Sequence, residues 1–133
     1  TRSICDDVPA RYINAKPSEE AISLKESLFG IDHIHHTVIV TEGPMDAMRI
    51  GPGAVAVFGT AYSQVQAILI SRYPVRVICF DNEPEAQTRA WKLGRTHQDF
   101  PGEPTRSICV LTAKDPGSAE EWEIEKIRRE YLK

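Results

Sequence analysis

The sequence has few cysteines, little net charge and no long apolar run. Its 133 residues include three cysteines, Cys5, Cys79 and Cys109, and no Cys-x-x-Cys pair, so neither a disulfide framework nor a zinc site of the usual spacing is expected. No apolar stretch approaches the length of a membrane span, and no signal peptide opens the chain. These absences favour an ordinary cytoplasmic protein with no membrane partner.

The formal net charge is −3, which argues against a strongly basic clamp for nucleic acid, because affinity for phosphates comes mainly from Lys and Arg. An enzyme that contacts nucleic acid through a local basic strip and bound metal ions remains compatible with this charge. The length suits one domain with a real hydrophobic core. Because position 1 is Thr rather than Met, we interpret the chain as an excised domain.

Four short apolar runs, each followed by a segment of helical character, organise residues 37–133. The expected strands are 37–41, 54–58, 75–80 and 107–111, and the expected helices are 44–50, 62–72, 84–97 and 120–131. The runs are continuous rather than alternating, which is typical of strands covered on both faces. This alternation predicts an α/β fold, a parallel, doubly wound sheet of about four strands with helices on both faces.

Residues 1–36 lack this alternation, and we expect them to pack on or extend the 37–133 domain as an N-terminal segment with one short strand at 11–14. Apolar side chains share a face on three expected helices: Val65, Ile68 and Leu69; Ala86, Ala90 and Leu93; and Ile124, Ile127 and Tyr131. Trp91 and Trp122 are interpreted as amphipathic cover of helices rather than as platforms for base stacking.

Carboxylates follow three of the four expected strands. Glu42 follows the first strand immediately, Asp81 and Glu83 follow the third, and Asp115 lies just beyond the fourth. Ligands of open parallel sheets bind at the carboxyl ends of the strands, so these acids are expected at one edge. Two unit charges about 4 Å apart repel by roughly 4 kcal/mol at an effective dielectric near 20. Divalent cations, which prefer oxygen ligands, would relieve this repulsion.

A structural explanation competes with the metal site. Glu42 and Asp81 each precede an expected helix, and carboxylates favour helix N-termini as caps. For any single acid the two explanations are about equally good, but three strand ends at once favour a metal-binding edge. Glu85 is expected in the first helical turn, away from this edge.

The motifs TVIVTEGPMDAMRI and VICFDNEPEAQTRAWKL resemble the two acidic motifs of the Toprim domain, a Rossmann-like domain shared by primases, topoisomerases, recombination mediators and a class of nucleases. The segment AVAVFGTAYSQVQ is similar to the Gly-Thr loop between them. Two departures stand out: Glu83 replaces the usual Asp, and Gly117 stands where a further acid is usual after Asp115. The preceding segments ARYINAKPS and SLKESLFGIDHI, and the later AKDPG, resemble bacterial and phage-type primases among these families.

The resemblance implies a role for each matching position. Glu42 would act as an acid, a base or a metal-linked carboxylate, and Asp81, Glu83 and Asp115 would hold Mg²⁺ or Mn²⁺ with it. Gly43 and Asp46 would support the Glu42 loop. The residues expected to face the nucleotide or the template are Lys25, Asn14, Lys16, Gly59 and Thr60.

The implied function is that of a primase, an RNA polymerase that makes primers by metal-dependent nucleotidyl transfer. Its partners would be single-stranded DNA, nucleoside triphosphates and, through regions outside this chain, a replicative helicase, in the cytoplasm of a bacterial or phage-infected cell. Two alternatives stay open at this point. One is a stand-alone Toprim nuclease or nucleic-acid processing enzyme, and the other is a non-catalytic module that binds a metal or a partner through the acidic edge.

Overall fold

Four parallel strands form the centre of the fold, in the order β2-β1-β3-β4. They are β1 (Thr37–Thr41), β2 (Ala54–Ala56), β3 (Val75–Cys79) and β4 (Arg106–Ile108). The computed structural model describes residues 24–34, 36–59 and 61–132. Within them, the parallel α/β sheet expected from the sequence is confirmed, with β1 and β3 at its centre.

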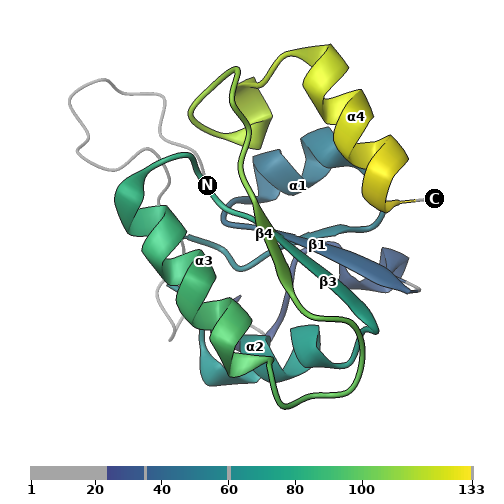
Figure 1. Ribbon diagram of the computed structural model, residues 1–133, viewed down its shortest axis with the longest axis vertical. Helices are drawn as coiled ribbons and strands as arrows, with labels where there is room; N and C mark the ends of the chain where they lie inside the picture. The colour runs from purple at the N-terminus through teal and green to yellow at the C-terminus, as the bar shows by residue number, and fades with distance from the viewer. Residues whose placement is uncertain (1–23, 35, 60, 133) are drawn as a thin grey trace.

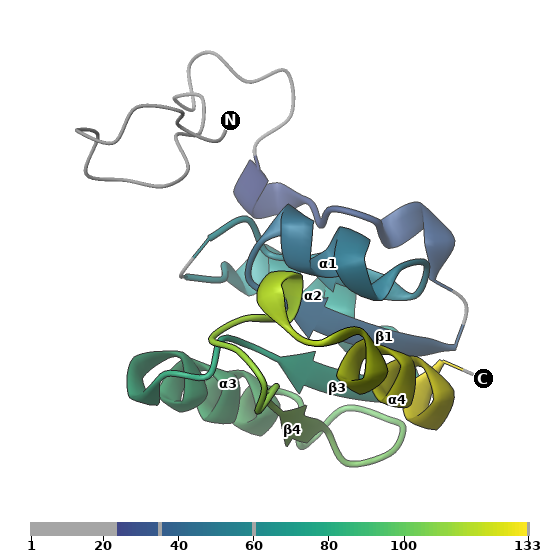
Figure 2. The same cartoon turned by 90° about the horizontal axis from the view of Figure 1, so that it is seen from above.

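Helices cover both faces of the sheet (Figures 1 and 2). They are α1 (Pro44–Ile50), α2 (Gln64–Ser71), α3 (Pro84–Thr96) and α4 (Glu121–Tyr131), together with the short 3₁₀ turns η2 (Leu24–Glu26), η3 (Ile31–His33) and η4 (Pro116–Ser118). Figure 1 shows α1 and α4 on one face and α2 and α3 on the other. None of the helices in the described part of the chain has the length and hydropathy needed to cross a bilayer.

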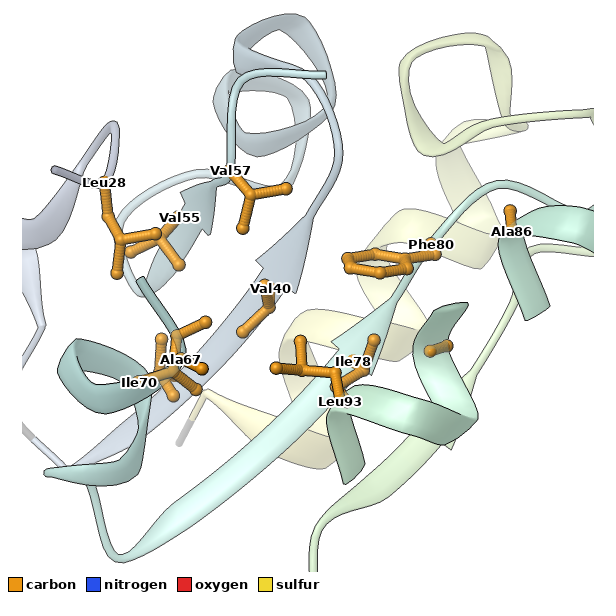
Figure 3. Packing of buried hydrophobic residues seen from close by; sticks show 12 residues of the cluster. Leu28, Val40, Val55, Val57, Ala67, Ile70, Ile78, Phe80, Ala86 and Leu93 are labelled. Atoms are coloured by element: carbon orange, nitrogen blue, oxygen red, sulfur yellow. The ribbon is translucent and has the colours of Figure 1, made fainter. Parts of the chain in front are cut away.

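The core consists of two apolar layers, one on each side of the sheet. Successive residues of a strand point to opposite faces, so Val40 and Ile78 pack under α2 and α3, whereas Ile39 and Val77 pack under α1 and α4. Figure 3 shows the first layer, where Leu93 of α3 lies beside Ile78. Because both central strands are buried on both faces, the sheet holds their carboxyl ends in fixed positions.

Three sequence-based expectations need correction. β4 is not covered on both faces: Arg106 and Ser107 are exposed, because β4 pairs with β3 alone and forms an edge of the sheet. β2 ends at Ala56 rather than at residue 58. The apolar face expected for residues 62–72 is wrong for Val65 and Ile68, which are exposed, whereas Leu69 packs partly buried against the core. The residues that α2 buries are Gln66, Ala67, Ile70 and Ser71.

The described part of the N-terminal segment packs on the core. Phe29 forms an antiparallel bridge with Ala56 of β2, and Leu28 is buried in the layer under α2 and α3. The division at residue 37 nevertheless stays a prediction. The strand expected at 11–14, together with Asn14, Lys16 and Thr60, lies outside the described residues.

Candidate active site

Glu42 follows the last residue of β1 and is 6% exposed. Burial raises the pKa of its carboxyl group, and the Arg89 guanidinium opposes this rise. Arg89 of α3 donates from Nη2 to Glu42 Oε1 at 2.9 Å. The pair therefore holds one carboxylate oxygen in a fixed position at the strand end.

Gly43 and Asp46 form the turn that follows Glu42. The Gly43 N–H lies 3.4 Å from Asp46 Oδ2, and the Gly117 N–H donates to Asp46 Oδ1 at 2.9 Å. The buried Asp46 carboxylate thus links the first turn of α1 to the turn η4, which lies far away in the sequence. This agrees with the supporting role expected for Asp46, although its function stays a prediction.

Asp81 lies at the carboxyl end of β3 and carries the largest pKa shift among the described carboxylates. Its pKa is raised to about 7, mainly by burial and further by the neighbouring carboxylates of Glu42, Asp46, Asp115 and Glu83. Asp81 Oδ1 is buried and has no hydrogen-bond partner among the described residues. The acids expected at one edge of the sheet therefore do lie within electrostatic reach of each other.

Glu83 occupies the N-cap position of α3, but its side chain makes no capping hydrogen bond. Its Oε1 lies 3.4 Å from Lys114 Nζ, an ion pair exposed on both sides. Asn82, between the two acids, donates from Nδ2 to Val110 O at 2.9 Å and from its backbone N–H to Lys114 O at 2.7 Å. These bonds join the loop after β3 to the loop after β4.

Asp115 is the one acid of the set for which the capping explanation holds, because its Oδ1 accepts from Ser118 N at 2.9 Å at the start of η4. Gly117, which stands where the resemblance expects another acid, is exposed, but two carboxylate oxygens lie close to the position that its Cβ would take. A Cβ atom there would lie 2.9 Å from Asp46 Oδ1. Asp46 thus fills the space that a side chain at position 117 would need.

The donor set suits a hard cation. In the described ranges, no three His, Cys, Asp or Glu side chains lie close enough to hold an ion by themselves. Mg²⁺ commonly takes only one or two carboxylates and completes its shell with water and substrate phosphates, so this does not conflict with a site centred on Asp81. The unpartnered, buried Asp81 oxygen is the feature that a bound cation would satisfy.

Lys25 and Gly59 meet at the loop after β2. The Lys25 ammonium donates to the carbonyl oxygens of Val57 at 3.2 Å, Phe58 at 3.3 Å and Ala61. Gly59 has a φ of 126°, and its N–H donates to Glu42 O at 2.9 Å, which places this loop directly beside the acidic edge. A role of either residue toward nucleotide or template stays a prediction.

Sequence reasoning missed the two basic partners, Arg89 and Lys114. Arg89 lies 47 residues from Glu42 in the sequence, and only the packing of α3 on the sheet, next to β3, brings the two together. A signal was present, because a basic side chain two turns into the helix after Asp81 lies close to the strand ends. Lys114 directly precedes Asp115, and nothing in the sequence around it indicated that it pairs with Glu83.

No family model matches the chain. A DNA primase of Campylobacter jejuni is 35% identical over 73% of this chain, which spans 18% of that protein's length. Among solved structures, the zinc-binding and RNA polymerase domains of the Aquifex aeolicus primase have a TM-score of 0.78 and 26% identity, covering 96% of this chain and 34% of that one.

A further structure has a similar fold. The DnaG primase catalytic domain, solved bound to single-stranded DNA, gives a TM-score of 0.74 over 97% of this chain and 45% of that chain. Its identity to this chain is 22%, so this likeness shows the fold alone. In the curated and solved relatives, the matched region is a minority of a longer chain.

Proposed function

Because this chain belongs to the bacterial-type DNA primases through its Toprim domain, we propose that it forms the catalytic core of an RNA polymerase that makes primers on single-stranded DNA. The observation that carries the proposal is the buried, unpartnered Oδ1 of Asp81, which lies near Glu42, Glu83 and Asp115 beyond the strand ends and near Asp46 in the first turn of α1. The two alternatives, a nuclease and a non-catalytic module, have no comparable support from the relatives.

The residues present fit a divalent cation, with Asp81 as its main ligand and Glu42, Glu83 and Asp115 as further candidates. Mg²⁺ or Mn²⁺ bound there would stabilise negative charge on the reacting phosphoryl group of a nucleoside triphosphate. The presence of Gly117 in place of an acid leaves one oxygen ligand fewer. A cation held there would then take water or a triphosphate oxygen as a further ligand.

The remaining chemistry belongs to the side chains. Arg89 orients Glu42 at the strand end and opposes the rise of its pKa, so that Glu42 would be placed to accept a proton or to bind the cation. Lys114 forms an exposed ion pair with Glu83, and a divalent cation held by Glu83 would compete with that pair. Gly59 lies next to Glu42 and has no side chain, so a substrate could approach the backbone closely at this position.

The substrates would be nucleoside triphosphates and a single-stranded DNA template, and a replicative helicase would contact parts of the protein outside this chain. The place of action would be the cytoplasm of a bacterial or phage-infected cell, where replication occurs. The substrates are tested by the incorporation assay below.

The test is template-directed incorporation of labelled ribonucleotides by the full-length protein with Mg²⁺ or Mn²⁺. Loss of both carboxylates in Asp81→Asn/Glu83→Gln should lower incorporation by about 100-fold or more. Glu85→Gln is the matched control, because Glu85 is exposed in the first turn of α3 and should leave the rate unchanged.

Two outcomes would contradict the proposal. If the double variant still incorporates ribonucleotides, Asp81 and Glu83 do not hold the catalytic metal ion. Metal-dependent cutting of DNA without any RNA synthesis would show that the protein is a nuclease and not a polymerase.

A further inference from the structure

Two tryptophans with equal exposure stand in opposite electrostatic surroundings. Trp91 on α3 is 59% exposed and Trp122 on α4 is 61% exposed. Lys92 and Arg95 accompany Trp91 on the exposed side of α3, whereas Trp122 lies among the acidic residues of the first turn of α4. Figure 1 shows the two helices on opposite faces of the sheet.

Trp91 carries a cation directly on its ring. The Arg95 guanidinium carbon lies 5.0 Å from the ring centroid, one helical turn along α3. In the ion-pair geometry of the described residues, neither Arg95 nor Lys92 has a carboxylate partner. An exposed aromatic ring with unneutralised basic neighbours is the combination that binds single-stranded nucleic acid, by stacking a base and attracting its phosphates.

A cavity of about 470 Å³ opens beside this pair, between α3 and the segment 97–105. Its wall includes Trp91, Arg95 and the partly exposed ring of Phe100. This volume lies in the range of small-ligand sites, which are about 300–1,000 Å³. Glu103 is the acidic side chain of the lining residues, and it faces Arg106 at 3.9 Å.

Arg76 makes the cavity rigid and positive. It is 1% exposed, and no carboxylate pairs with it in the described part of the chain. Its guanidinium donates to Pro101 O at 3.0 Å, Glu103 O at 3.2 Å and Thr105 Oγ1 at 3.1 Å. These bonds fix the 97–105 segment to β3 and leave a buried positive charge at the base of the cavity.

We propose that the surface formed by Trp91, Lys92, Arg95 and the adjoining cavity binds single-stranded nucleic acid, with a base stacked on Trp91 and phosphates beside the basic side chains. Position 91 lies about 12 Å along the helix axis from Glu83, at 1.5 Å per residue. A single-stranded nucleic acid that runs along α3 from this surface therefore reaches the acidic edge. The identity of the ligand rests on the proposed function, but the surface itself is separate from the carboxylates.

The test measures the affinity of the full-length protein for fluorescein-labelled oligodeoxythymidylate by anisotropy, in EDTA and without nucleoside triphosphates. Trp91→Ala should weaken binding about tenfold, because stacking of one base is lost. Trp91→Phe should restore part of the affinity. Arg95→Gln should lower the slope of log K against log salt by about 0.7, the value for one phosphate contact on a single strand.

Trp122→Ala is the matched control, since it removes an equally exposed ring from an acidic helix and should leave the affinity unchanged. Thermal melting confirms that each variant is folded. The assay contains EDTA and no nucleoside triphosphates, so its outcome is independent of metal binding and of primer synthesis.

Unchanged affinity in Trp91→Ala, or an equal loss in Trp122→Ala, would overturn the proposal. A Trp91→Ala variant that binds the oligonucleotide normally but melts at a lower temperature would also overturn it. In that case the surface would be a contact with another part of the protein.

Discussion

At the scale of single residues, Glu42 and Asp81 are both acids withdrawn from water, and their neighbours differ. Burial raises the pKa of each, but Glu42 has a guanidinium at 2.9 Å. Asp81 Oδ1 has no partner among the described residues. Asp81 is therefore the carboxylate whose charge costs the metal-free fold most, and the one that a cation would stabilise most.

Replacing Asp81 by Asn should stabilise the metal-free protein at neutral and alkaline pH. The carboxyl pKa rises from 3.8 to about 7 on folding, so the folded state binds more protons between these values. Stability therefore falls as pH rises through this window, and Asp81→Asn removes the loss. In EDTA at about pH 8, the variant should melt several degrees above wild type, whereas near pH 4 the two should agree.

Mg²⁺ should raise the melting temperature of wild type and leave that of Asp81→Asn unchanged, because the ion replaces the missing partner of the carboxylate. Asp99→Asn is the control, since Asp99 is exposed and distant from the strand ends. A variant that melts below wild type at about pH 8 would show that the Asp81 carboxylate is satisfied without a metal.

Replacing Arg89 by Met should destabilise the fold by about 1–3 kcal/mol, because Glu42 loses its charged hydrogen-bond donor while it stays buried. Arg89→Lys keeps the charge and should lose less. Chemical denaturation of Arg89→Met, of Glu42→Gln and of the variant that carries both substitutions measures the coupling energy of the pair. A coupling energy of zero would mean that the pair does not hold Glu42.

At the scale of elements, the acidic edge depends on hydrogen bonds between loops. Asp46 joins α1 to η4, and Asn82 joins the loop after β3 to the loop after β4. Glu123 of α4 accepts from the N–H groups of Leu111 and Thr112. The turn that carries Asp115 is therefore held from both sides, and its position follows the packing of α1 and α4.

Adding the acid that the resemblance expects at position 117 should not create a better metal site. The Cβ of Gly117→Asp would lie 2.9 Å from Asp46 Oδ1, an atom already bonded to the backbone at position 117. We expect a loss of about 1–2 kcal/mol on denaturation and no gain in Mg²⁺ affinity by calorimetry. Ser118→Asp adds the same charge on the exposed next residue and controls for electrostatics. Tighter Mg²⁺ binding at unchanged stability would contradict this steric account.

The elements themselves were largely predictable. Residues 37–41 and 44–50 match β1 and α1 to the residue, because continuous β-branched runs and a proline in the first turn are strong local signals. The buried face of α2 was not predictable, since Gln66 is buried there by hydrogen bonds to Ser27 O and Val57 O. Periodicity of apolar residues cannot anticipate a buried amide that is satisfied by distant backbone.

At the scale of the whole molecule, the sequence predicted that acids gather at one edge of the sheet, but it did not predict which basic side chains pair with them. That Glu42, Asp81, Glu83 and Asp115 lie at one edge follows from the parallel sheet that alternation of strands and helices predicts, because each acid comes after the carboxyl end of a strand. The pairing of Glu42 with Arg89, and of Glu83 with Lys114, depends on how helices and loops pack in three dimensions. Local patterns carry no information about such pairs.

The isolated chain should bind Mg²⁺ without making primers. The acids that would hold the ion come from β1, β3 and the segment after β4, and all lie within this chain. The chain spans 18% of the length of its Campylobacter jejuni relative, so further surfaces that would position template and nucleotides, beyond the one proposed on α3, are expected elsewhere in the full-length protein.

Differential scanning calorimetry should therefore show a Mg²⁺-dependent rise in melting temperature for the 133-residue chain, and the incorporation assay should give product only with the full-length protein. Asp81→Asn in both proteins tests whether one site accounts for both results, because it should abolish the thermal shift in the first and synthesis in the second. Primer synthesis by the isolated chain at the full-length rate would show that the carboxylate edge and its immediate neighbours suffice for catalysis.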